Sequence, residues 1–213
     1  PQGGDGYYHR DIKTYDHYAY IVGEMFGTNQ GLIILDMQYL PDSVHFVQAY
    51  TDSLQIYSHN ISIDTATGYL YVESQGDSGI HVYSLANPEA PVREGFIPTI
   101  NTHDMFARND TVWVAEGYTY AYSVWDLTTK SNPQIMTRIT DPGFGYAHQI
   151  WPSEDGKYFY TTEETDFKTV KCWEWQSNTN VVRRGQYLGP CDLAHNAHVE
   201  DGIVWLSHYE SGV

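Results

Sequence analysis

The sequence predicts an all-β fold of the β-propeller class. Three observations support this: a repeat with a period in the forties, short strand-like segments in each repeat, and no segment with long helical periodicity. The repeat is marked by a His or Arg that is followed by Asp, Asn or Gln. These pairs are Arg10-Asp11, His59-Asn60, His103-Asp104, His148-Gln149 and His195-Asn196, at spacings of 49, 44, 45 and 47 residues. Four short strands in a unit of this length are typical of a propeller blade.

Each repeat opens with an alternating segment, such as residues 59–64, and continues into a turn rich in Asp, Gly, Asn and Thr, which tolerate positive φ. Runs of β-branched and aromatic residues then predict second strands at 18–22, 69–72, 112–115, 158–161 and 203–206. Third strands are expected at 31–36, 79–84, 122–126 and 170–174. Asn-Pro turns at 87–92 and 131–135 lead into outer strands, where a residue without an N–H is tolerated.

These segments predict a single propeller domain over residues 1–213. Its blades lie at about 8–50, 57–98, 101–140 and 146–188, with half a blade at about 193–213. A half-blade leaves an open strand edge, which natural folds avoid. We therefore expect the sequence to be part of a six- or seven-bladed propeller, in which the remaining blades or a partner chain complete the half-blade. A five-bladed propeller with a shortened last blade is the alternative.

The chain is strongly acidic, with 27 Asp and Glu against 11 Lys and Arg and a formal net charge of −16. No basic cluster is present to displace counterions from phosphates, so we expect no nucleic-acid partner and no polybasic membrane contact. The longest apolar runs, such as residues 32–35, are too short to cross a bilayer. The acidic surface fits a salty or extracellular setting, and attraction of divalent cations is the alternative.

Two further features of the composition leave alternatives open. The 19 Tyr are explained first by packing between blades, and a stack of exposed Tyr that binds glycans is the second interpretation. Cys172 and Cys191 could be bridged in an oxidising compartment or stay as two thiols. The start at Pro1, without Met or a signal-like segment, predicts a processed or incomplete N-terminus.

The repeat also predicts where polar side chains converge. The first strand of a propeller blade is innermost and pairs with the second, so the start of one lies beside the end of the other. The predicted metal ligands at one mouth of the channel are His59, His103, His148 and His195. The predicted neighbours of these ligands are Glu24, Glu73, Glu116, Glu163 and His208, with Arg10, Asp11 and Asp104 near them.

Imidazole and carboxylate groups together are ligands for Zn, Fe, Cu or Mn, and carboxylates also bind Ca. The alternative is structural: each His locks neighbouring blades by bonding a backbone carbonyl or a carboxylate, and its Asp, Asn or Gln neighbour satisfies turn amides. Arg10 cannot ligate a metal and favours the structural alternative. His198 should point to the face opposite His195 and pack there, and His9, His17, His45 and His81 fall outside the register.

Eight stretches of the chain carry a resemblance to a known family, and together they cover nearly all of it. They are residues 10–15, 59–64, 68–72, 102–104, 124–127, 130–133, 145–149 and 155–159. This ordered combination resembles the choice-of-anchor B proteins, a secreted bacterial group related to the LVIVD-repeat propellers. The resemblance implies a secreted or surface-anchored propeller with further blades, located outside the cell or in the periplasm.

Three functional hypotheses follow. The first is a secreted or cell-surface binding or scaffold module that presents its channel mouth and inter-blade loops to a protein, a glycan or an ion. The second is a metal-dependent oxidoreductase or hydrolase with a transition metal on the channel histidines. The third is a structural subunit of an extracellular assembly. The sequence has no nucleophile elbow, no phosphate-binding glycine loop and no His-Glu-x-x-His motif, so it assigns no catalytic residue and favours a binding role.

Overall fold

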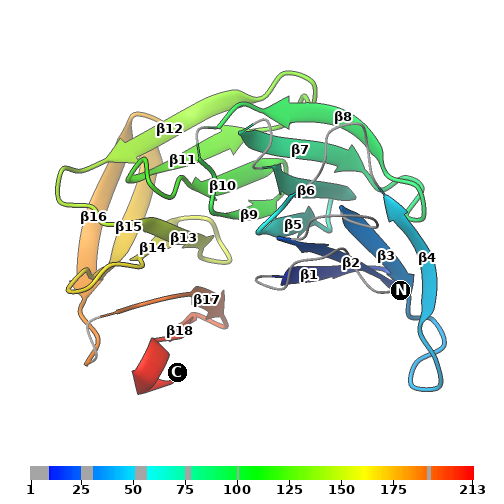
Figure 1. Ribbon diagram of the computed structural model, residues 1–213. Helices are drawn as coiled ribbons and strands as arrows, with labels where there is room; N and C mark the ends of the chain where they lie inside the picture. Colours follow the sequence, from blue (N-terminus) through cyan, green and yellow to red (C-terminus); the bar gives the residue numbers. More distant parts are fainter. Residues whose placement is uncertain (1–9, 25–30, 51–56, 75–77, 100, 191–192) are drawn as a thin grey trace. The chain divides into compact units, whose positions relative to one another are not determined.

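The computed structural model describes residues 10–24, 31–50, 57–74, 78–99, 101–190 and 193–213. Within these ranges the chain consists of antiparallel β-strands and one short 3-10 helix (Figure 1). Four sheets have four strands each, and a fifth has two. Each strand pairs with its neighbours in sequence, so every sheet is a meander. The predicted all-β propeller fold, with four full blades and a partial fifth, is confirmed.

The strands have the following bounds. The first sheet contains β1 (Arg10–Tyr15), β2 (Tyr18–Gly23), β3 (Leu32–Asp36) and β4 (His45–Tyr50). The second contains β5 (Ile61–Asp64), β6 (Tyr69–Ser74), β7 (Gly79–Ser84) and β8 (Val92–Ile97). The third contains β9 (Asp104–Arg108), β10 (Thr111–Ala115), β11 (Ala121–Asp126) and β12 (Gln134–Thr140). The fourth contains β13 (Ala147–Pro152), β14 (Tyr158–Glu163), β15 (Val170–Ser177) and β16 (Asn180–Tyr187). The fifth contains β17 (Ala197–Glu200) and β18 (Ile203–Leu206), and the 3-10 helix η1 (Tyr209–Ser211) follows it.

The chain divides into two compact units. The first unit contains the first and second sheets, together with residues 107–110 and 127–133. The second unit contains residues 103–106, 111–126 and 134–213, which form most of the third sheet, the fourth sheet and the β17–β18 pair. The prediction of one domain over residues 1–213 stays a prediction.

The polar pairs lie at the starts of the first strands, as the repeat predicted. β5 begins two residues after His59, and β13 begins one residue before His148. The pairing places the start of a first strand beside the end of its second strand, as in Ala147 opposite Glu163. The turns between them use positive φ, for example 71° at Gly68 and 50° at Asn109. Short side chains and glycine adopt this conformation at little cost, which is why the turns are rich in Asn, Asp and Gly.

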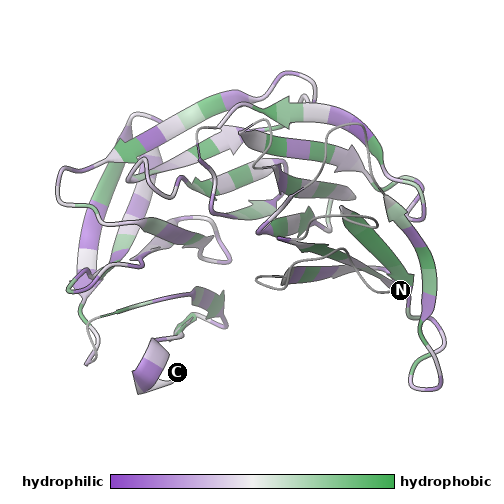
Figure 2. Ribbon diagram, viewed as in Figure 1, coloured by the Kyte–Doolittle hydropathy of each residue, from purple (hydrophilic) through white to green (hydrophobic). Residues whose placement is uncertain are grey.

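The inner strands supply the hydrophobic core of each unit. In the first unit, Tyr20, Leu70 and Val72 belong to a cluster of buried side chains drawn from both sheets. In the second unit, Trp113 and Phe159 belong to a cluster drawn from the third and fourth sheets. Figure 2 shows hydrophobic residues along β2 and β3, whereas outer strands such as β16 carry hydrophilic stretches. Packing between neighbouring sheets therefore provides the main burial of apolar surface.

First strands are joined to one another by side chains of the repeat. Asp11 Oδ2 accepts a hydrogen bond from the Ile61 N–H at 3.1 Å, which ties β1 to β5 in the first unit. In the second unit, Gln149 Oε1 accepts one from the Ala197 N–H at 2.6 Å, which ties β13 to β17. Asp11 and Gln149 are each the second member of a polar pair. These residues satisfy edge-strand amides that no neighbouring strand reaches.

Buried tyrosines add a second set of bonds between sheets. The Tyr20 hydroxyl donates to the Pro88 carbonyl at 2.9 Å in the first unit. The Tyr122 hydroxyl donates to the Thr162 carbonyl at 2.7 Å in the second. Burial raises the pKa of the Tyr122 phenol well above its ordinary value, so it stays a donor. These contacts support the interpretation that many of the tyrosines pack between blades.

We expect Leu70→Ala to destabilise the chain strongly, because Leu70 is fully buried in the first-unit core and its loss leaves a cavity. The expected loss in unfolding free energy is ~3 kcal/mol, measured by urea denaturation. Ile135→Ala, at a position of β12 that is 51% exposed, is the matched control and should change stability by less than ~0.5 kcal/mol. Equal losses for the two variants would contradict this description of the core.

Candidate functional site at the starts of the first strands

His59 forms a polar bridge between the first two sheets. Its Nδ1 lies 2.9 Å from Glu24 Oε1, where Glu24 follows the end of β2. The backbone N–H of His59 donates to Glu73 Oε2 at 2.6 Å. Two of the predicted glutamates therefore contact His59, one through the ring and one through the backbone. This arrangement is the one expected for a histidine that locks neighbouring blades.

His103 has a comparable structural bond in the second unit. Its Nδ1 lies 2.9 Å from the backbone oxygen of His148. A carbonyl oxygen can only accept, so Nδ1 of His103 carries the proton in this bond. The His103 and His148 rings lie 4.3 Å apart, centre to centre. His103 thus joins the start of the third sheet to the start of the fourth.

His148 and His195 come together with a carboxylate. Their ring centres are 4.2 Å apart, and His148 Nε2 lies 3.6 Å from Glu164 Oε2. One potential ligand atom from each of the three residues lies within 4.8 Å of the other two. His148 is buried, whereas Glu164 and His195 are half-buried. Three separate segments of the chain, β13, the residue after β14 and the residues before β17, supply these groups.

Tyrosines surround this group. The Tyr209 hydroxyl donates to Glu164 Oε1, and its ring meets the His195 ring edge-on at 5.1 Å. Partial burial and the bond to Glu164 raise the pKa of Tyr209 to about 12. Tyr146 packs edge-on against His103 at 5.1 Å. We name six of these residues the His–Tyr cluster, which consists of His103, Tyr146, His148, Glu164, His195 and Tyr209.

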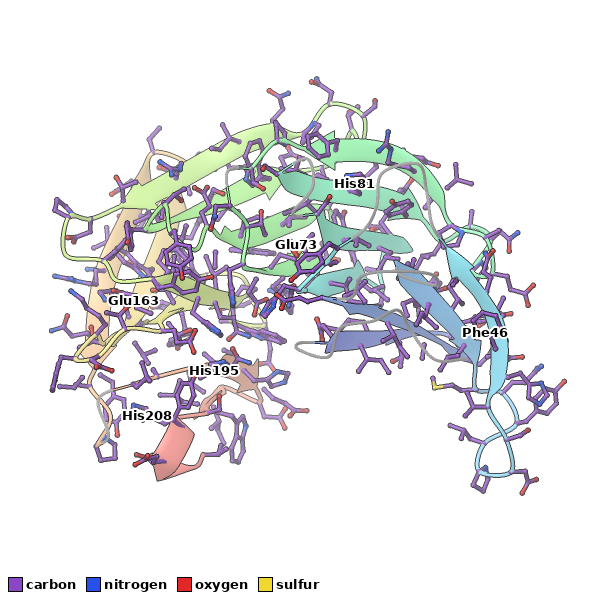
Figure 3. The ribbon with its side chains drawn as sticks, viewed as in Figure 1. Phe46, Glu73, His81, Glu163, His195 and His208 are labelled. Atoms are coloured by element: carbon purple, nitrogen blue, oxygen red, sulfur yellow. The ribbon has the colours of Figure 1, made fainter. Side chains whose placement is uncertain are left out.

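The other predicted glutamates bond to groups outside the His–Tyr cluster. Glu163, which is labelled in Figure 3, is fully buried. It forms an ion pair with Lys171 and accepts the Gly145 N–H at 2.6 Å. Glu116 is buried and accepts two hydrogen bonds from Arg138, at 2.7 and 2.9 Å. These pairings compensate the charge of each buried carboxylate and hold loops and outer strands in place.

The remaining predicted residues have varied positions. Asp104 is buried at the start of β9. His208 is buried, and its Nδ1 has no hydrogen-bond partner among the described residues. The side chain of Arg10 lies outside the described part of the chain. The prediction that four histidines form one metal site stays a prediction: His103, His148 and His195 lie together in the second unit, and His59 belongs to the first.

Predictions about the other histidines and the cysteines have mixed outcomes. His198 points away from the buried face of β17 and is exposed, with its ring 4.4 Å from that of Trp151. His81 is fully buried, whereas His45 is exposed. Cys172 is a free thiol, and burial raises its pKa. Cys191 lies outside the described residues.

Sequence reasoning did not assign Glu164 and Tyr209 to the site. Glu163 ends β14 and Glu164 follows it, so the two side chains of this doublet point to different surroundings. The strand register predicted Glu163, which is the buried member of the doublet. Tyr209 lies in η1, beyond the last predicted strand, and its backbone φ is 37°. The doublet was the one signal in the sequence that could have identified Glu164.

The β17–β18 pair leaves an apolar surface beside the fourth sheet. Ile203 and Trp205 of β18 are about half exposed, whereas second strands in the complete sheets bury residues such as Leu70 and Val112 fully. On the opposite face of β18, towards the fourth sheet, lies a cavity of about 340 Å³, lined by Tyr160, Val170, Cys172, Gly185, Gln186, Tyr187, Val204 and Leu206. Among the strands that the structure describes, β18 pairs with β17 alone. Completion of this sheet by further strands or a partner chain stays a prediction.

Comparison with known proteins supports the fold only. No family model matches the chain, and no curated protein matches it. Many solved structures are similar. Among the described residues, no helix is long and apolar enough to cross a membrane.

Three of these structures are two proteins named as lactonases and one β-propeller domain. A putative 6-phosphogluconolactonase from Bacteroides uniformis has a TM-score of 0.71 and 10% identity over 94% of this chain and 63% of that one. A periplasmic gluconolactonase from Pseudomonas aeruginosa has a TM-score of 0.69 and 13% identity over 90% of this chain and 60% of that one. The Cps50 (Swd1) β-propeller domain of Myceliophteria thermophila has a TM-score of 0.67 and 9% identity over 92% of this chain and 65% of that one.

The chain therefore spans less than two thirds of the length of each of these proteins. At identities this low the likeness establishes the architecture and leaves the activity open. The chain has a β-propeller fold, similar to that of two proteins named as lactonases and of the Cps50 (Swd1) β-propeller domain.

The buried carboxyl of Glu73 should make stability depend on pH. Burial raises its pKa from 4.5 to about 8, so between these values the folded chain binds more protons than the unfolded chain. Its contribution to stability is complete below about pH 4.5 and is lost as the pH rises towards 8. Relative to Glu73→Gln, the wild type should lose up to ~1.4 kcal/mol per pH unit in this window, measured by urea unfolding at several pH values.

Glu200→Gln, at an exposed position of β17, is the control for this measurement and should follow the wild-type curve. If the free energy of unfolding varies with pH in the same way for the wild type and Glu73→Gln, burial does not raise the pKa of the Glu73 carboxyl.

Proposed function

We propose that this chain is part of a secreted or cell-surface β-propeller of the choice-of-anchor B type, located outside the cell or in the periplasm, and that it acts as a binding module. Its ligand contacts the His–Tyr cluster at the starts of the first strands. The chain's acidic character and the resemblance of its motifs to that secreted group support the location. One structural neighbour is described as periplasmic, which fits the same proposal.

The observation that carries the proposal is the grouping of imidazoles and tyrosines in one place. Tyr118 is 69% exposed, and its ring lies 4.6 Å from that of Tyr146, a member of the cluster. Tyr209 is about half exposed beside His195. Exposed aromatic faces next to hydrogen-bonding imidazole and phenol groups are suited to a sugar ring, which has an apolar face and a rim of hydroxyls. A glycan is therefore the organic ligand that we favour.

Binding to a panel of immobilised oligosaccharides tests this function. The wild-type chain should retain a subset of glycans, and Tyr118→Ala should weaken that binding by at least ~10-fold, which is a change of ~1.4 kcal/mol. The matched control is Tyr187→Ala, which removes a similarly exposed tyrosine from β16. Failure of the wild type to retain any glycan, or an equal loss in the control variant, would contradict the proposal.

A metal-dependent enzyme is the second candidate function. The specific observation in its favour is the approach of His148, Glu164 and His195 to within 4.8 Å of one another. Two structural neighbours carry the names of lactonases, which makes lactone hydrolysis a concrete reaction to test. In this reaction water adds to the lactone carbonyl, the ring ester bond breaks, and the acid product releases a proton.

Titration of that proton at constant pH, with D-glucono-1,5-lactone as substrate and Zn²⁺ or Mn²⁺ present, measures the rate. If the chain is such an enzyme, hydrolysis should exceed the uncatalysed background, and His148→Ala should reduce it by at least ~100-fold. His198→Ala, which changes a histidine on the exposed face of β17, should retain the wild-type rate. A rate equal to the background with both metals would reject lactone hydrolysis.

A further inference from the structure

We propose that His148, His195 and Glu164 bind one divalent transition metal ion of the zinc class. The ligand set differs from the four-histidine ring expected from the repeat, since it contains a carboxylate and omits His59 and His103. This inference rests on the proposed function and deepens it, because it names an ion as one ligand of the His–Tyr cluster.

The separations of the ligand atoms fit such an ion. Zinc bound by His and carboxylate groups at ~2.0–2.2 Å in a tetrahedral site places its ligand atoms ~3.3–3.6 Å from one another. His148 Nε2 and Glu164 Oε2 already lie 3.6 Å apart. All three ligand atoms lie within 4.8 Å of one another, so no pair of them needs to approach by more than ~1.2–1.5 Å. Glu164 and His195 are half-buried, and rotation of their side chains can supply this movement.

The backbone around the ligands is held by hydrogen bonds. The His148 carbonyl accepts from His103 Nδ1 at 2.9 Å. The His195 carbonyl accepts from the Thr162 hydroxyl at 2.5 Å, and the His195 N–H donates to the Ser207 carbonyl at 3.0 Å. These bonds fix the positions from which the two imidazoles project. A site with a fixed backbone loses less entropy when it binds an ion.

The Glu164 carboxylate has its two oxygens directed to different partners. Oε1 accepts the hydrogen bond from the Tyr209 hydroxyl, and Oε2 lies nearest to His148 Nε2. The Glu164 N–H donates to the Tyr146 carbonyl at 3.1 Å, which fixes its backbone. In metal sites, a hydrogen bond like the one from the Tyr209 hydroxyl orients a ligating carboxylate. Tyr209 is therefore a positioning residue for Glu164.

His103 is better explained as part of the scaffold than as a fourth ligand. It is not in the group of described residues whose ligand atoms lie within 4.8 Å of one another, and its Nδ1–H supports the carbonyl of the ligand His148. Three protein ligands leave a coordination position open to an oxygen from solvent or from a bound molecule. Two imidazoles with one carboxylate favour Zn, Mn or Fe over Ca, which requires six or more oxygen ligands. The net charge of −16 also raises the local concentration of cations.

Isothermal titration calorimetry with ZnCl₂ tests the site. The full chain is purified without a polyhistidine tag and treated with a chelator before the titration. It should bind one Zn²⁺ with a saturable isotherm, and CaCl₂ should give none. The absorption spectrum with Co²⁺ provides a second readout, because a tetrahedral site gives intense bands in the visible region.

Matched variants identify the ligands. Glu164→Gln preserves the shape of the side chain and should weaken Zn²⁺ binding by at least ~10-fold, as should His148→Ala and His195→Ala. Tyr209→Phe should weaken binding less and change the Co²⁺ spectrum, since it removes only the bond that orients Glu164. His198→Ala should bind Zn²⁺ like the wild type. Thermal unfolding of each apo variant shows whether the fold is retained.

Two outcomes would overturn the inference: no saturable Zn²⁺ binding by the wild type, or binding that persists in all three ligand variants. The glycan experiment separates this failure from that of the proposed function. Glycan binding that depends on Tyr118, without any Zn²⁺ binding, would reject the ion site and leave the binding module. Zn²⁺ binding that depends on Glu164, without any glycan binding, would support the ion site and reject the glycan as ligand.

Discussion

The structure depends on how the edge amides of the first strands are satisfied. Each sheet begins with an edge strand, which has amides that no strand of its own sheet can reach. Asp11 provides the acceptor for Ile61 in the first unit, and Gln149 provides it for Ala197 in the second. In the first unit Ser62 does the same for Ala107, and Asp64 accepts from the N–H of Asp110 in the turn after β9. The polar residues of the repeat therefore join consecutive sheets.

The histidines of the repeat have two different roles. His59 bonds to Glu24, and His103 bonds to the His148 carbonyl, so each connects two sheets. His148 and His195 instead lie with Glu164 and Tyr209, where the carboxylate is held from one side and faces an imidazole on the other. The repeat thus places similar residues at similar positions, and differences between neighbouring segments determine their chemistry. The buried glutamates Glu116 and Glu163 serve packing, with Arg138 and Lys171 as their counter-charges.

The sequence predicted most of the fold because local patterns are strong in this chain. Alternating strands, turns with positive φ and the polar pairs recur in every sequence repeat, and the structure has the corresponding strands. The candidate site was predicted in part. His148 and His195 followed from the repeat, but Glu164 did not, since periodicity cannot tell which of two adjacent glutamates turns into the core. Tyr209 follows the last strand and belongs to no repeated position.

The sequence by itself determined the all-β class, the order of the strands and the positions where polar residues begin each repeat. These properties depend on residue type and spacing, which are local. The tertiary structure decided which side chains meet: His103 with a backbone carbonyl, Glu163 with Lys171, and Glu164 with His148 and Tyr209. Such partnerships join residues from different strands and loops, and they depend on side-chain direction and burial after the sheets have packed.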